Sequence, residues 1–159
     1  MADIEKTGDW DGFAKLLAEA GSKFKANIQN ATNQSGELIK AKVKDRINAN
    51  QVTPATSAKF TAWKEKHGFS TDTLRMTGDL EAAIQYQSKD WNAGFVGVNR
   101  NAVGKDGQSL VSIAAVMEFG CLSKAKSGLP KPFIGPVVEQ EGPKIVENYQ
   151  KAIDETFKK

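Results

Sequence analysis

An apolar stripe at helical spacing runs through residues 10–49, and it constrains the fold more than any other feature of the sequence. Its members recur at steps of three and four residues: Phe13, Leu17, Ala20, Phe24, Ile28 and Ala31, then Leu38, Ile39, Val43 and Ile47. One straight helix of this length spans about 60 Å, whereas a compact chain of 159 residues has a radius of gyration of about 15 Å. Two alternatives follow. Either the helix breaks near residues 33–36, where Gly36 is a weak point, or it projects and packs on neighbouring subunits.

Asp9 or Asp11 is positioned to cap the start of this helix, and Pro54 follows its end. Four further elements are predicted: a short helix at 57–67, a β-hairpin at 83–99 with its turn near 90–93, a short buried helix or a strand followed by one at 109–119, and an amphipathic helix at 136–157. We expect Phe60 and Trp63 to face inward. Gly97 indicates a bulge or a close backbone approach in the second strand.

Composition excludes several classes of protein. The longest apolar run is five residues, Ile113 to Met117, far short of the roughly twenty that a membrane-spanning helix needs. The first five residues are acidic and show no secretory signal. A single cysteine, Cys121, cannot form an intrachain disulfide, which fits a reducing compartment.

The residues that carry out catalysis are scarce. His67 and Cys121 are the only histidine and the only cysteine, so a zinc site lacks ligands and a cysteine–histidine dyad would need this one pair. No phosphate-binding or dinucleotide-binding glycine motif is present. We therefore expect a protein that is not an enzyme and that holds no cofactor or metal.

The net charge of +3 is spread evenly along the chain and gives weak support for nucleic-acid binding. One local concentration stands out, the loop with Lys124, Lys126 and Lys131 and no acid between them. These lysines could face DNA in a lumen, but a solvated or interface loop is the favoured interpretation, because tight phosphate contacts multiplied around a ring would retard DNA.

Three motifs in a fixed order carry a resemblance to a known family. They are Leu74-x-x-Thr77-Gly78-Asp79-Leu80, then Ala114-Ala115-Val116-Met117-Glu118-Phe119-Gly120, and then Leu129-Pro130-Lys131-Pro132-Phe133-Ile134-x-Pro136. Over residues 70–157 the chain resembles the head–tail connector or tail-completion (neck) proteins of tailed bacteriophages, and is similar to Mu-type virion morphogenesis proteins. It departs from their pattern at Lys131, where arginine is usual, because lysine lacks the planar bidentate fork.

The resemblance implies an α+β fold, in which a long N-terminal helix and a C-terminal helix pack on a small antiparallel β-sheet. Residues 1–159 would form one domain, with the long helix at 10–49, a β-hairpin and strap core at 70–134, and the C-terminal helix at 136–157.

The resemblance also implies a structural virion protein of the neck, which completes the tail and joins it to the head. It would form part of a homo-oligomeric ring, hexameric by analogy, through which DNA passes without sequence-specific binding. The implied partners are further copies of the chain, the portal or adaptor protein, and the tail tube or terminator protein. The implied location is the virion, with the host cytoplasm during assembly.

Specific interface residues follow from these motifs. Glu118 is predicted to pair with a base, Lys131 or Arg75, across a subunit seam; the alternative is a surface carboxylate at a helix end, where the helix dipole disfavours it. Phe119 and Phe133 are expected to fill the core. Pro130 and Pro132 would hold an extended strap with little entropy left to lose on docking.

Two other functions stay open. Within virion proteins, the chain could be a tail terminator that caps the tail tube. From a different class, it could be a small nucleic-acid-binding module, which would be a monomer that binds duplex DNA with a steep salt dependence.

Overall fold

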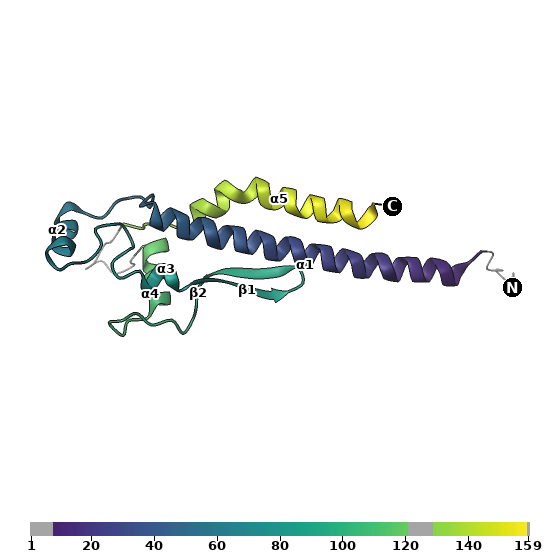
Figure 1. Ribbon diagram of the computed structural model, residues 1–159, viewed down its shortest axis with the longest axis horizontal. Coiled ribbons are helices and arrows are strands. Elements are labelled where there is room, and N and C mark those ends of the chain that lie inside the picture. The colour runs from purple at the N-terminus through teal and green to yellow at the C-terminus, as the bar shows by residue number, and fades with distance from the viewer. Residues whose placement is uncertain (1–7, 121–128, 159) are drawn as a thin grey trace.

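The computed structural model describes residues 8–120 and 129–158. Its elements in chain order are α1 (Trp10–Asn48), α2 (Ala58–Lys66), α3 (Asp79–Ala82), β1 (Ile84–Asp90), β2 (Ala93–Val98), α4 (Leu110–Phe119) and α5 (Gly135–Phe157). The predicted α+β architecture is confirmed: a long N-terminal helix and a C-terminal helix accompany a two-stranded antiparallel sheet. Figure 1 shows α5 along one side of α1 and the hairpin along the other.

The long helix is unbroken. α1 runs for 39 residues, and the carboxylate of Asp9 caps it by accepting a hydrogen bond from the backbone N–H of Gly12 at 2.8 Å. Of the two alternatives for residues 33–36, the break is wrong. The small residues Ser35 and Gly36 are buried there, and they let other elements approach α1 closely. Packing against α5 and the hairpin therefore holds this stretch helical.

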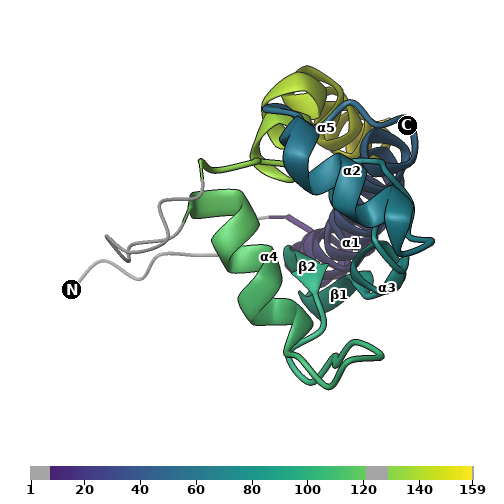
Figure 2. The ribbon, with the colours of Figure 1, turned by 90° about the vertical axis from the view of Figure 1, so that its left-hand side faces the viewer.

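The main core lies where the C-terminal half of α1 meets the hairpin, α4 and the start of α5. It is built from buried apolar side chains: Ile39, Val43, Ile47, Val52, Leu80, Ile84, Ala114, Phe133 and Val137. A smaller cluster lies nearer the N-terminus of α1. It joins Ile28 and Ala31 to Ala152 of α5, and Phe24, Trp91 and Tyr149 pack against it. Figure 2 shows the end view, in which α1 lies between α5 and the two strands.

The two strands of the hairpin pair antiparallel. Strand pairing runs from Ile84 opposite Val98 to Asp90 opposite Ala93, so the predicted turn is confirmed. The irregularity in pairing lies between Ser88 and Asp90, not at Gly97, where a side chain would meet nothing within 4 Å.

The close approach lies at two other glycines. The ring of Tyr86 on β1 covers Gly36 of α1 and Gly94 of β2, and at either glycine an added Cβ would collide with that ring. The hydroxyl of Tyr86 donates a hydrogen bond to Oδ1 of Asn33 at 2.8 Å. Glycine at position 36 therefore lets the hairpin sit against the helix.

Replacing either of two glycines of α1 with alanine is expected to change the free energy of unfolding, in opposite directions. Gly21→Ala should raise the free energy of unfolding by about 0.5–1 kcal/mol, because alanine favours a helix and nothing lies within 4 Å of the new methyl group. Gly36→Ala should lower it by about 1–3 kcal/mol, because the methyl group overpacks against Tyr86. Urea denaturation measures both. Stabilisation by Gly36→Ala would contradict this packing; in a Tyr86→Ala background, however, we expect that substitution to become stabilising.

Two helices, α2 and α5, leave several of their apolar side chains exposed. Phe60 and Trp63 of α2 are 45% and 42% exposed, so the prediction that they face inward is wrong. α2 instead buries Lys64, and the two rings stack on each other with centroids 5.4 Å apart. In α5, which continues through Pro143, the buried residues are Val137, Ala152 and Thr156, while four apolar side chains are exposed: Val138, Val146, Ile153 and Phe157.

Candidate functional site

The carboxylate of Glu118 lies against the first residues of α5. Its Oε2 accepts hydrogen bonds from the backbone N–H groups of Phe133 (2.8 Å) and Ile134 (3.1 Å), and its Oε1 accepts one from Gly135 (2.8 Å). The first N–H groups of a helix lack partners within that helix, and they carry a partial positive charge. Ile134, the N-cap residue, makes no capping bond with its side chain. Glu118 therefore caps α5 from an earlier helix.

The contact with α5 explains why an acid is found at the C-terminal end of α4, where the dipole of that helix disfavours it. Glu118 is the penultimate residue of α4, where the helix dipole opposes a negative charge. The N-terminus of α5 supplies the compensating positive end, and each bond from a backbone N–H to an ionised carboxylate is stronger than a neutral one. The end of α4 and the start of α5 are thereby joined across the intervening loop.

The two bases considered for Glu118 have other contacts within the chain. The guanidinium of Arg75 lies 3.8 Å from the carboxylate of Asp72, and the backbone N–H of Lys131 donates to the carbonyl of Met117 at 2.6 Å. Within the chain, the carboxylate of Glu118 binds backbone amides rather than the side chain of Lys131 or Arg75. A contact across a subunit seam stays a prediction.

The strap that follows residue 128 has no regular secondary structure up to residue 132, and it bends at residues 133–134, where Ile134 already has right-handed helical dihedral angles. Phe133 is fully buried in the main core, which confirms its predicted place. Phe119 is 82% exposed, so its predicted core position is wrong. α4 turns Leu110 and Ala114 to the core, and Phe119 lies five residues beyond Ala114 on a different side of the helix. Pro130 is exposed, and Pro132 is half-buried.

The predicted lumen residues, Lys124 and Lys126, lie outside the described residues, as does Cys121. His67 is exposed; its ring stacks on Trp63 with centroids 4.3 Å apart, and its Nδ1 lies 2.7 Å from the carbonyl oxygen of Trp63. Within residues 8–120 and 129–158, no three His, Cys, Asp or Glu side chains gather to hold a metal ion. No helix in that same part of the chain has the length and apolarity to cross a membrane.

A cavity of about 1070 Å³ lies at the end of the molecule where α2, α3 and α4 meet. Its apolar wall includes Phe60, Leu74, Met76, Ile113, Met117 and Leu129. Sequence reasoning missed this cavity, because its residues come from segments that are far apart along the chain and carry no shared motif.

Two of the three lysines in the wall of this cavity, Lys64 and Lys131, are largely removed from water. Lys64 is 3% exposed; its ammonium group donates to the carbonyl of Asp72 at 2.7 Å and lies 5.6 Å from the centroid of the Phe60 ring. Burial lowers the pKa of Lys64, and the like charge of Lys131 lowers it further, against an opposing effect of Asp72. Burial also lowers the pKa of Lys131. The cavity therefore carries partly desolvated positive charge.

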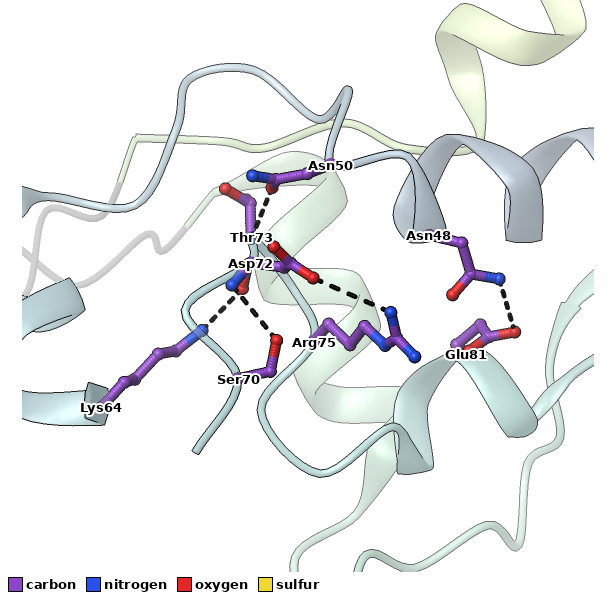
Figure 3. A network of polar contacts seen from close by, with 8 residues as sticks. All are labelled: Asn48, Asn50, Lys64, Ser70, Asp72, Thr73, Arg75 and Glu81. Atoms are coloured by element: carbon purple, nitrogen blue, oxygen red, sulfur yellow. Dashed lines mark hydrogen bonds and ion pairs between the residues drawn. The ribbon is translucent and has the colours of Figure 1, made fainter. Parts of the chain in front are cut away.

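Polar contacts tie the cavity wall to the end of α1 (Figure 3). The backbone N–H of Thr73 donates to Oδ1 of Asn50 at 2.7 Å, and Nδ2 of Asn48 donates to Oε1 of Glu81 at 3.1 Å. Asn50 has a positive φ of 52°, a conformation that asparagine tolerates better than most residues. The loop that carries Asp72 is thus anchored, and it presents the carbonyl that holds Lys64.

The opposite end of the molecule leaves apolar side chains uncovered. Figure 1 shows α1 extending past α5 and the hairpin at its N-terminal end. Residues 10–23, which we call the overhang, contain no buried residue, and the first buried one is Ile28. Four large side chains of the overhang are exposed: Trp10 (53%), Phe13 (54%), Leu16 (66%) and Leu17 (58%). The overhang is therefore a candidate assembly surface.

Comparisons with protein-family models, with curated proteins and with solved structures found no significant match.

Proposed function

We propose that this protein is a structural component of a tailed-phage neck, which completes the tail and joins it to the head. It acts as one subunit of a homo-oligomeric ring, hexameric by analogy, through which DNA passes. Its mechanism is assembly rather than catalysis. It works in the virion after assembling in the host cytoplasm, with a portal or adaptor protein and a tail tube or terminator protein as neighbours.

The overhang carries this proposal. A helix whose first fourteen residues leave four large apolar side chains in water is typical of a chain that packs against other subunits, because monomers rarely leave such surface contiguous and uncovered. Trp and Phe are also among the residues enriched at protein interfaces. The unbroken α1 matches the alternative in which the helix projects to neighbouring subunits.

The contact between the second and third motifs supports the same family. Glu118, from the motif that ends α4, caps the helix that begins within the strap motif of residues 129–136. The two motifs thus form one structural unit, in which an acid at a fixed position sets where the strap enters the core. Because this contact gives a physical reason for the two motifs to occur together, it strengthens the resemblance to the neck proteins that is based on them.

The test is the oligomeric state of the purified protein, measured by native mass spectrometry and by electron microscopy of negatively stained particles. We expect a discrete oligomer with ring-shaped particles, formed by the protein alone or with a co-expressed neck partner. A strict monomer under both conditions would overturn the proposal. If that monomer also bound duplex DNA with a steep salt dependence, the nucleic-acid-binding module would replace it.

A further inference from the structure

Among the described residues, the overhang and the cavity present apolar side chains at opposite ends of the molecule. The overhang forms the N-terminal end of α1, and the cavity lies beyond the other end of that helix, among α2, α3 and α4 (Figure 1). Pockets that take whole ligands span about 300–1000 Å³, so a cavity of about 1070 Å³ has room for several large side chains. The cavity is therefore large enough to take side chains of an overhang. The overhang of the same chain lies at the opposite end of the molecule and cannot reach it.

The overhang continues a face that is already an interface. Its stripe recurs at steps of three and four residues: Trp10, Phe13, Leu17, Ala20 and Phe24. The same stripe goes on to Ile28 and Ala31, which are buried against Ala152 and Tyr149 of α5. α5 ends at Phe157, so the face runs beyond its partner. This continuity indicates that the overhang packs against further apolar surface in the same way.

The shape of the cavity favours it over a second overhang as that surface. The overhang carries two acids, Asp11 and Glu19, and two bases, Lys15 and Lys23, so its net charge is zero. The charged residues of the cavity wall are Lys64, Lys105, Lys131, Asp79 and Asp106, so charge does not oppose the contact. Large anchor side chains at protein interfaces fill pockets on the partner, and the cavity supplies a pocket that the face of a second helix does not.

We propose that the overhang of one copy docks into the cavity of a second copy, head to tail. A contact between two different surfaces of the same chain is heterologous, and it generates a ring when the rotation between copies closes. The inference rests on the proposed homo-oligomeric ring and names the contact that builds it. The large side chains Trp10, Phe13 and Leu17 enter the apolar part of the cavity.

The first experiment compares variants by native mass spectrometry. Phe13→Gln with Leu17→Gln disables the overhang, and Phe60→Gln with Leu129→Gln disables the cavity; all four residues are exposed in the single chain, so folding should be retained. We expect each double variant to lose at least 90% of the oligomer. The matched control is Ala18→Gln with Ser22→Gln, on the opposite face of the overhang, which should assemble like the wild type.

The second experiment mixes the two defective variants. The overhang variant keeps an intact cavity, and the cavity variant keeps an intact overhang, so one productive contact remains between them. We expect a 1:1 heterodimer of about twice the 17.2 kDa chain mass and no ring. Circular dichroism of each variant verifies that the helices are retained.

The outcomes separate this contact from the proposed function. If the wild type forms rings and either double variant still assembles, the head-to-tail contact is wrong and the ring stands. If the cavity variant assembles while the overhang variant does not, the overhang pairs with itself or with another surface, and the proposal is again overturned. A wild type that stays a monomer with and without a neck partner overturns the proposed function itself.

Discussion

Replacing Phe133 with alanine is expected to lower the free energy of unfolding by about 3–5 kcal/mol. The side chain is fully buried and packs in the main core with residues of α1, the hairpin and the start of α5. Its removal leaves a cavity at the point where the strap enters the core. Urea denaturation followed by circular dichroism measures the loss, and head–tail joining in a complementation assay should be defective.

The control for this prediction is Phe119→Ala. The same substitution there removes a ring that is 82% exposed, so we expect a change of less than about 0.5 kcal/mol in the free energy of unfolding of the single chain. Equal losses for the two variants would contradict the burial of the strap. A stable Phe133→Ala protein with a normal yield of virions would count against the role of the strap in assembly.

Replacing Glu118 with alanine is expected to lower the free energy of unfolding by about 2–3 kcal/mol. Three backbone N–H groups at the start of α5 lose a charged acceptor, and hydrogen bonds to charged groups contribute more than neutral ones. Water can reach part of this site and offsets some of the loss. Hydrogen exchange should also show faster exchange of the Phe133, Ile134 and Gly135 amides.

Two variants make the test of Glu118 specific. Glu118→Gln keeps one acceptor oxygen and should cost less than alanine, about 1–2 kcal/mol, because the charge is lost but a neutral hydrogen bond remains. Glu139→Ala removes an exposed glutamate of α5 and should change the free energy of unfolding by less than about 0.5 kcal/mol. Unchanged exchange of the three amides in Glu118→Ala would show that the carboxylate does not cap α5.

Helix and strand positions were largely predictable because they depend on interactions close in sequence. The spacing of Ile28, Ala31, Ile39 and Val43 carries the helical period, and the glycines and charged residues around the hairpin mark its turn. Asp9 as the cap of α1 and Gly120 at the end of α4 follow from the same local chemistry.

The candidate site was predictable only in part. The motifs drew attention to Glu118 and Phe133, and both have defined structural roles. The backbone amides that Glu118 binds within the chain were not predicted, and the prediction that Phe119 lies in the core is wrong. A carboxylate accepts bonds from lysine, arginine or backbone amides with little sequence difference, and the side of a ten-residue helix that faces the core depends on what is packed against it.

The sequence by itself determined that this chain builds a long helix, a hairpin and a terminal amphipathic helix, since periodicity, caps and turn residues act over a few positions. Only the tertiary structure decided that α1 stays unbroken at Gly36, where the ring of Tyr86 fills the space that a side chain would occupy. It also decided which apolar residues stay in water at the overhang and which line the cavity. These outcomes depend on contacts between segments that are tens of residues apart. The sequence pattern within α1 does not show where α5 or the hairpin ends along that helix.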